Sequence, residues 1–199
     1  QDELQTLYTS GTVFHAFLGE KLPDWKAAAN LVKKIANMDN KFAGYDIPRF
    51  FLCALAEEFL AWYFYIMIGN VLTGKERPAI EKFFAETAED EYGDHAKWLM
   101  KRMKELNIYC NEMNDPASWN TFAAHKYTAP AYGDVMNTSQ ALTIAIQMEK
   151  DAIETYKAFE LATRDSDPVS NQKIREILAD EEEHLEALTS FSLDMLTTK

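Results

Sequence analysis

The chain has 199 residues, of which 20 are Lys or Arg and 32 are Asp or Glu, giving a formal net charge of −12 at pH 7. Such an acidic chain is repelled by nucleic-acid phosphates and by anionic membrane surfaces, so we expect neither as a partner. Hydrophobic residues make up 47% of the sequence, which excludes a disordered protein and is typical of a chain with a sizeable core.

Helices are favoured along most of the chain, because only 7 Gly and 6 Pro interrupt long segments rich in Ala, Leu, Glu, Lys and Met. Residues 2–20 and 24–39 predict one or two helices, which we assign to an N-terminal helical extension over residues 1–45. The remaining residues, 46–199, are expected to form one further domain.

Four long helices are predicted in this second domain. Each begins at a capping residue or a proline and places apolar residues at steps of three and four. The expected ranges are 47 to Gly69 or Gly74, 79 to about Asn107, a start at Asn137, Thr138 or Ser139 continuing to about Arg164, and 168 to about Leu196.

The connection between the second and third helices, residues 107–137, is about 30 residues long and shows little periodicity. A short loop makes neighbouring helices antiparallel, whereas this length can cross the whole bundle and lets the two helices run parallel. We therefore predict an all-α four-helix bundle with one long crossover. The first helix is apolar enough for a membrane span, but Glu57 and Glu58 near its middle would cost several kcal/mol in lipid, so we predict a core helix instead.

Carboxylates lie on the apolar face of all four helices. The six side chains that share this placement are Glu58 on the first, Glu91 and His95 on the second, Glu149 on the third, and Glu181 and His184 on the fourth. A buried carboxylate requires a proton, a cation or a metal. Solvated glutamates and a metal-free Glu/His network are the alternatives, but six residues in matching order in both halves favour metal binding.

The ligand types indicate which metals. Glu from two helices, with a Glu and His pair from each of the other two, is the ligand set of carboxylate-bridged di-iron and di-manganese bundles. Hard carboxylate oxygens stabilise higher oxidation states, and the charges of four Glu balance two divalent ions. A charge-balanced metal pair can therefore occupy a core from which bare acids would be excluded.

These motifs resemble the ferritin-like superfamily. Residues 58–65 are similar to the first-helix ligand motif of ferritins and bacterioferritins. Residues 149–156 and 181–184 are similar to the third- and fourth-helix motifs of bacterioferritins and of Dps-like peroxide-resistance proteins, and the resemblance covers about residues 47–196. It implies that Glu58 and Glu149 are terminal ligands, that Glu91 and Glu181 are bridges, and that His95 and His184 each bind one metal. Tyr65 and Tyr156, each seven residues after a Glu, are the candidate catalytic residues, which would orient the carboxylates. Aromatic core packing is the alternative role for both.

The second helix departs from the family pattern of Glu-x-x-His. Tyr92 stands three residues before His95, and Glu91 stands four residues before it. A four-residue spacing keeps both side chains on one face, and a π-bulge could restore the register. If Glu91 is not a ligand, Asp94 or Glu89 would replace it, or the site would be asymmetric.

The resemblance implies a ferroxidase that oxidises Fe(II) with hydrogen peroxide or oxygen, for iron detoxification and storage and for protection against oxidative stress. Two iron ions are the expected cofactor, with manganese as the alternative metal. Members of the superfamily form closed cages, so we expect a homo-oligomer, either a 12-mer or a 24-mer. A substrate-oxidising hydroxylase or oxygenase and a di-manganese catalase are the alternative functions. A fused rubredoxin module is disfavoured, because it needs four cysteines.

The two cysteines, Cys53 and Cys110, lie far apart in the sequence without a CxxC motif, which is not the pattern of a disulfide framework or a thiolate metal site. Reduced thiols, and the absence of a signal-peptide pattern after Gln1, lead us to predict a cytoplasmic protein. A redox role for the two thiols near the metals is not favoured, since Cys53 lies about 140° around the helix from Glu58.

Overall fold

The computed structural model describes residues 42, 44–108 and 136–197. The chain divides into two compact units, Gln1–Ala43 and Gly44–Lys199, and the second unit contains the four long helices. The helices expected in residues 2–20 and 24–39, and most of the connection 107–137, lie outside the described residues.

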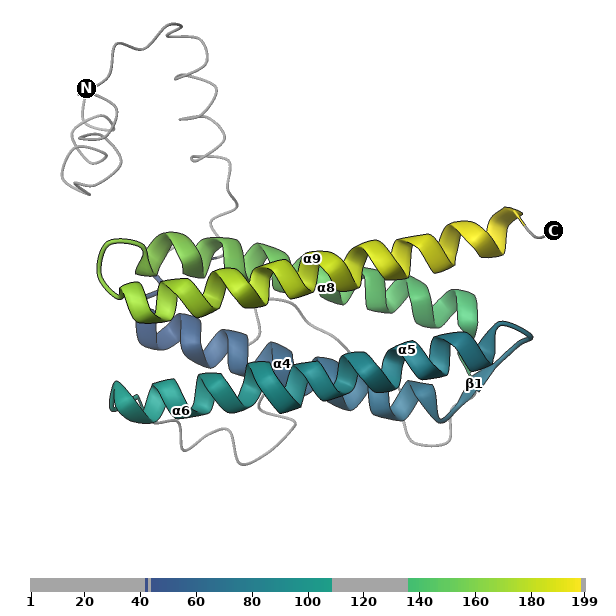
Figure 1. Cartoon of the computed structure of the whole chain (residues 1–199), viewed down its shortest axis with the longest axis horizontal. Helices are drawn as coiled ribbons and strands as arrows, with labels where there is room; N and C mark the ends of the chain where they lie inside the picture. The colour runs from purple at the N-terminus through teal and green to yellow at the C-terminus, as the bar shows by residue number, and fades with distance from the viewer. Residues whose placement is uncertain (1–41, 43, 109–135, 198–199) are drawn as a thin grey trace, which may run out of the picture. The chain divides into compact units, whose positions relative to one another are not determined.

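The second unit is the predicted all-α bundle (Figure 1). Its first, third and fourth long helices are α4 (Ile47–Gly69), α8 (Thr138–Thr163) and α9 (Pro168–Thr197). The second long helix is continuous but has three segments: α5 (Arg77–Asp90), the π-helix η2 (Glu91–Ala96) and α6 (Lys97–Glu105). Helix α4 packs along this second helix and against α8, and α8 packs along α9. The described residues of the second unit thus form two helical hairpins that pack against each other.

The capping residues explain where these helices begin. The carboxylate of Asp46 accepts a hydrogen bond from the backbone N–H of Arg49 at 2.9 Å and so caps α4. Of the three candidates for the start of α8, Asn137 is the cap, and it forms a reciprocal capping box with Gln140. Each cap satisfies backbone donors that the first turn of a helix leaves without a partner.

The second long helix ends at Glu105, two residues before the expected end. Asn107 adopts a left-handed conformation with φ of 56°, which asparagine tolerates better than most residues. The backbone N–H of Ile108 then bonds to the carbonyl of Met103 at 2.8 Å, which is the closing bond of a Schellman motif.

A two-residue parallel strand pair fixes the topology. Strand β1 (Leu72–Thr73) follows α4, and strand β2 (Met136–Asn137) precedes α8. Because β1 leads into α5 and β2 leads into α8, these helices begin at the same end of the bundle and run parallel. The long crossover between the second and third helices is therefore confirmed. The strands themselves were not predicted, since two residues are too few to show an alternating pattern.

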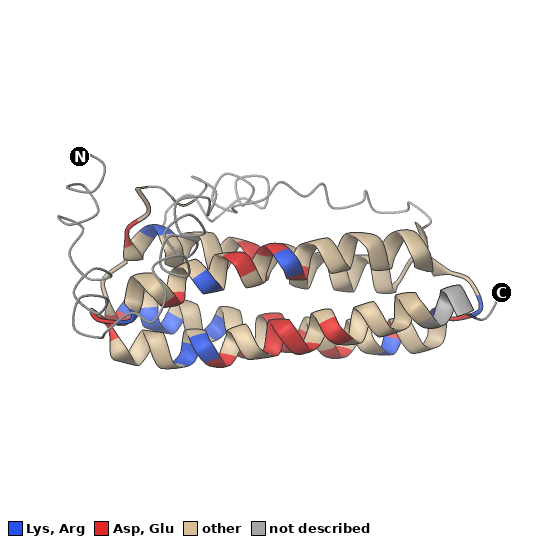
Figure 2. Cartoon of the chain, turned by 90° about the horizontal axis from the view of Figure 1, so that it is seen from above, with Lys and Arg blue, Asp and Glu red and all other residues tan. Residues whose placement is uncertain are grey.

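Helix α4 is long and apolar enough to cross a membrane by length and composition, with a mean hydropathy of 1.6 over its most apolar window. However, 61% of that window is buried inside the structure, as in the core helix of a bundle. Several Asp and Glu residues lie near the middle of the long helices (Figure 2), and Glu57 and Glu58 are among the buried residues.

Candidate metal centre

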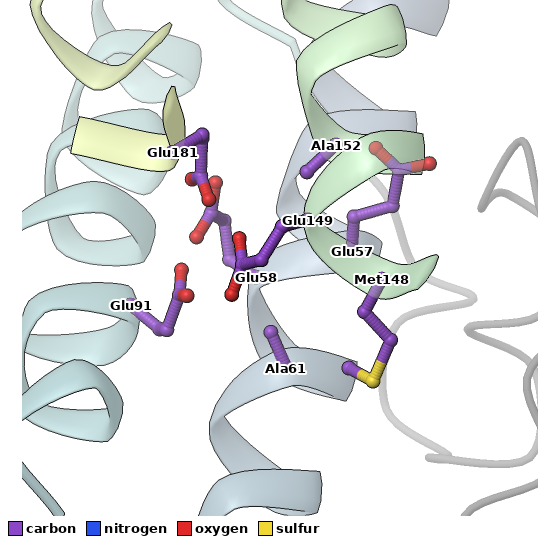
Figure 3. Close-up of a pocket in the computed structure, with 8 residues that line it drawn as sticks. All are labelled: Glu57, Glu58, Ala61, Glu91, Met148, Glu149, Ala152 and Glu181. Carbon is purple, nitrogen blue, oxygen red and sulfur yellow. The ribbon is translucent and has the colours of Figure 1, made fainter. Parts of the chain in front are cut away.

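The structure brings all six predicted ligands together at the centre of the bundle. None is more than 7% exposed, although each has a polar or charged side chain. They are Glu58 on α4, Glu91 and His95 on η2, Glu149 on α8, and Glu181 and His184 on α9. Figure 3 shows the four carboxylates converging on a common point from the four helices.

The ligand atoms fall into two overlapping groups, and within each group they lie within 4.8 Å of one another. The first group is Glu58, Glu91, His95 and Glu181, and the second is Glu91, Glu149, Glu181 and His184. Glu91 and Glu181 belong to both groups, as carboxylates shared between two metals would. Glu58 and Glu149 belong to one group each, as terminal ligands would.

Both imidazoles direct Nδ1 toward the carboxylates. The Nδ1 of His95 lies 3.3 Å from Glu58 Oε2 and 3.3 Å from Glu181 Oε1. The Nδ1 of His184 lies 3.7 Å from Glu91 Oε1 and 3.7 Å from Glu181 Oε2.

Several buried polar atoms in this cluster have no hydrogen-bond partner: Glu91 Oε1, Glu181 Oε1 and His184 Nδ1. Buried polar atoms without partners are rare in folded proteins because each costs free energy. Metal ions bound between the carboxylates would satisfy these atoms, so the donor set fits a pair of metals.

The electrostatics show how costly the metal-free cluster is. Burial, followed by the charge of the nearby Glu181, raises the pKa values of Glu91 and Glu149 well above their usual range. Burial acts in the same direction on Glu181, but the adjacent imidazoles of His184 and His95 lower its pKa below the usual value. Burial acts to lower the pKa values of both imidazoles, but the carboxylates outweigh it and raise them. In the metal-free cluster, burial therefore disfavours the ionised forms of Glu91 and Glu149.

The two tyrosines contact the terminal ligands in a crossed arrangement. The hydroxyl of Tyr65 on α4 donates a hydrogen bond to Glu149 Oε1 on α8, and the hydroxyl of Tyr156 on α8 donates one to Glu58 Oε1 on α4. Burial, and then the charge of the contacted carboxylate, raises the pKa of each hydroxyl, so both remain protonated donors. Each tyrosine thus orients the carboxylate of the opposite helix and not that of its own.

The π-helix accounts for the unusual spacing of Glu91 and His95. A π-helix widens the turn through i→i+5 hydrogen bonds. A spacing of four residues therefore brings both Glu91 and His95 to the cluster, as a spacing of three brings the Glu and His of α9 there. The alternative ligands are placed differently. Glu89 is exposed, and Asp94, with 57% of its side chain exposed, lies 2.6 Å from the ammonium of Lys173. Glu91 is the carboxylate that reaches both metal-ligand groups.

Sequence reasoning missed two carboxylates on the outer side of the imidazoles. The Nε2 of His95 lies 3.3 Å from Asp180 Oδ2, and the Nε2 of His184 lies 3.7 Å from Asp90 Oδ2. These aspartates border a pocket of about 320 Å³ that reaches both imidazoles. The sequence contained a signal for these two carboxylates, because an Asp directly precedes a core Glu in both halves of the bundle.

Sequence reasoning also left the role of Glu57 open. This residue is buried, but its carboxylate points away from the four converging glutamates (Figure 3). It accepts a hydrogen bond from the Thr155 hydroxyl at 3.0 Å, and the Cys53 sulfur lies 4.0 Å from the same oxygen. Cys110 lies outside the described residues, so the pairing of the two cysteines stays untested.

Comparison with known proteins places the chain in a family. Residues 50–192 match the sequence profile of the Rubrerythrin family. The chain belongs to the rubrerythrin family. Domains of this family are ferritin-like bundles that bind a di-iron centre through carboxylates, and the buried Glu/His cluster agrees with that chemistry.

Solved structures support the same placement. A bacterioferritin-related protein from Bacteroides fragilis, described as a dodecameric thioferritin, is 27% identical with a TM-score of 0.70, covering 82% of this chain and 95% of its own. A ferritin-like di-iron carboxylate protein from Bacillus anthracis shares the fold at 20% identity with a TM-score of 0.57, covering 73% of this chain and 94% of its own. No curated protein matches the sequence.

Proposed function

We propose that this rubrerythrin-family chain is a di-iron ferroxidase that oxidises Fe(II) with hydrogen peroxide or oxygen, for iron detoxification and storage and for protection against oxidative stress. The observation that carries the proposal is the pair of overlapping ligand groups that share Glu91 and Glu181. Two groups with two shared carboxylates suit a pair of closely spaced ions better than one ion.

The six ligand residues and the two tyrosines have separate roles in this proposal. Glu58 and His95 would hold one ion, Glu149 and His184 would hold the other, and Glu91 and Glu181 would contribute to both sites. The iron pair, when bound, supplies the redox chemistry. Tyr65 and Tyr156 hold the terminal carboxylates in place through hydrogen bonds and keep their own protons. The surrounding aromatic core excludes bulk water.

The sizes and linings of two cavities favour a cation as the substrate over an organic molecule. Within the described residues, the cavity beside the four glutamates measures about 10 Å³, whereas pockets for organic ligands hold about 300–1,000 Å³. The larger pocket at the imidazoles is lined by five carboxylates: Glu86, Asp90, Asp94, Asp180 and Glu183. Such a lining attracts Fe(II). A hydroxylase or oxygenase is therefore less well supported than a ferroxidase.

A cytoplasmic homo-oligomer is part of the proposal. The similar protein from Bacteroides fragilis is described as dodecameric, which favours a 12-mer over a 24-mer. Four large apolar side chains on α4 and on the second helix are more than a third exposed: Tyr63, Ile66, Tyr92 and Met100. Contact with another copy would bury these side chains.

Anaerobic Fe(II) titration followed by oxidation tests the function. Wild-type protein should bind two irons per chain and consume hydrogen peroxide or oxygen as the iron is oxidised, with native mass measured in parallel. Glu181→Ala should lose stoichiometric binding, whereas Glu182→Ala, which removes an exposed carboxylate from the same helix, should retain it. Unchanged iron binding and oxidation in Glu181→Ala would refute the site. Rapid peroxide disproportionation with Mn(II) and no Fe(II) oxidation would support the catalase alternative instead.

A further inference from the structure

A third group of metal-type ligands lies outside the core cluster, at the wall of the pocket beside the imidazoles. Ligand atoms of Asp94, His95 and Asp180 lie within 4.8 Å of one another, and all three residues line this pocket of about 320 Å³. The imidazole is buried, whereas about half of each aspartate side chain is exposed. The group therefore lies between the solvent and the core cluster.

A cation of the protein itself lies on this group. The ammonium of Lys173 on α9 lies 2.6 Å from Asp94 Oδ2 and 3.7 Å from Glu176 Oε2. Burial acts to lower the pKa of Lys173, but the carboxylates of Asp94, Glu176 and Asp180 outweigh it and raise this pKa. Only 18% of the lysine side chain is exposed, so its charge is held against the protein. The position between the two aspartates thus suits a cation.

The other half of the pocket has no lysine at the equivalent place. Lys173 stands seven residues before Asp180 on α9, whereas the residue seven positions before Asp90 on the second helix is Phe83. The ring of Phe83 packs edge-on against His184, with 6.4 Å between the ring centroids. The repeated ligand pattern therefore does not require a lysine, and its presence on one side only needs a separate explanation.

We propose that Asp94 and Asp180 form an outer site for a divalent cation, and that Lys173 occupies this site with its ammonium until a metal ion displaces it. Two carboxylates and water are suitable ligands for a hard divalent cation such as Mg(II), Mn(II) or Fe(II). Asp180 can offer one oxygen to this ion while its Oδ2 faces Nε2 of His95. The outer site does not depend on the proposed function, but the identification of its natural cation as incoming Fe(II) rests on it.

Competition with Lys173 keeps the outer site weak. The tethered ammonium must leave Asp94 before a metal ion can bind there, and its positive charge repels that ion while it remains nearby. Weak binding suits a place of entry, because an ion that is held tightly at the pocket wall would not move on to the core. Removal of the lysine charge should therefore convert a weak site into a tighter one.

Titration with Mn(II), with the free ion measured by electron paramagnetic resonance, gives the affinity of each bound ion. In the wild type the outer ion should bind last. Lys173→Met keeps an unbranched side chain without the charge and should tighten the last ion by about 10-fold, whereas Lys173→Arg keeps the charge and should behave like the wild type. Lys157→Met is the matched control, because Lys157 on α8 also pairs with a carboxylate of α9, Glu182 at 2.9 Å, but does not line the pocket.

A second substitution locates the added affinity. Asp94→Asn in the Lys173→Met background should return the last ion to its wild-type affinity. The inference is overturned if Lys173→Met leaves the last ion unchanged, if Lys157→Met tightens it equally, or if the gain survives Asp94→Asn. These outcomes are separate from a failure of the di-metal site, which would appear as a wild type without tightly bound core ions.

Nitrogen-15 NMR of the lysine side chains tests the displacement in the wild type, without any substitution. As Mg(II) is added, the ammonium signal of Lys173 should move toward the position typical of a solvated lysine, because the metal ion takes its place at Asp94. The signal of Lys157 should move less. A Lys173 signal that stays fixed while Mg(II) binds would show that the ion does not displace the ammonium, and the inference would be wrong.

Discussion

The crossed tyrosine hydrogen bonds should stabilise the fold measurably. Tyr156→Phe removes the hydroxyl that donates to Glu58, and Tyr65→Phe removes the one that donates to Glu149. The tyrosines are at most 1% exposed and the two glutamates 2% exposed, so water cannot replace the lost donor. Removing one partner of a buried hydrogen bond costs about 1–3 kcal/mol, because the other partner is left unsatisfied. For a chain of this length that corresponds to a loss of about 2–12 °C in Tm.

Urea unfolding of the metal-free protein measures the loss in the free energy of unfolding. Zinc affinities, measured by competition with a chelator, show which metal site each substitution affects. Tyr156→Phe should weaken the metal held by Glu58, and Tyr65→Phe the metal held by Glu149. Tyr63→Phe, which changes a tyrosine that is 36% exposed on α4, is the control. If the two buried substitutions cost no more free energy of unfolding than Tyr63→Phe, the hydroxyl contacts do not stabilise the carboxylates, and the reasoning is refuted.

Three further results are expected. Metal removal should lower Tm by about 10–20 °C, because two sites filled at a hundred times their dissociation constants contribute about 5 kcal/mol; a chelator that leaves Tm unchanged would contradict this. Glu91→Ala should abolish binding of both metals in a zinc titration, whereas Glu89→Gln should still bind two. Burial acts to raise the pKa of Asp167, but hydrogen bonds from Ser170 and Arg102 outweigh it and lower this pKa. The ionised Asp167 carboxylate should therefore stabilise the fold above about pH 4. This stabilisation should be lost as the pH falls through the lowered pKa. Unfolding measured against pH should show that Asp167→Asn removes this dependence.

Much of the fold could be predicted because local signals decide it. The caps at Asp46 and Asn137 are satisfied within three residues of chain, so the sequence shows them directly. The core glutamates could also be predicted from the sequence, since a carboxylate at helical spacing among apolar residues is unusual. The long crossover followed from a connection too long for an antiparallel turn.

The remaining features depend on contacts between helices, which periodicity does not encode. A spacing of seven residues places Tyr65 on the same face as Glu58, yet its hydroxyl bonds to Glu149 on the neighbouring helix. The contact between Asp180 and His95 likewise joins two helices. The π-helix was suggested by a spacing one residue too long, but its extent from Glu91 to Ala96 depends on backbone hydrogen bonds that no sequence pattern specifies.

Under the proposed di-metal function, the residues that make the metal-free core costly are the ones that would hold the metals. A raised pKa at Glu149 means that the folded state disfavours its ionised form, so at neutral pH this group opposes folding until a cation arrives. The apolar residues around Phe64, Phe84 and Leu142 supply burial that offsets this cost. The tyrosine contacts keep the terminal carboxylates in place meanwhile. In the proposed di-metal site, bound ions would take the place of protons, so metal binding would be coupled to the stability of the fold.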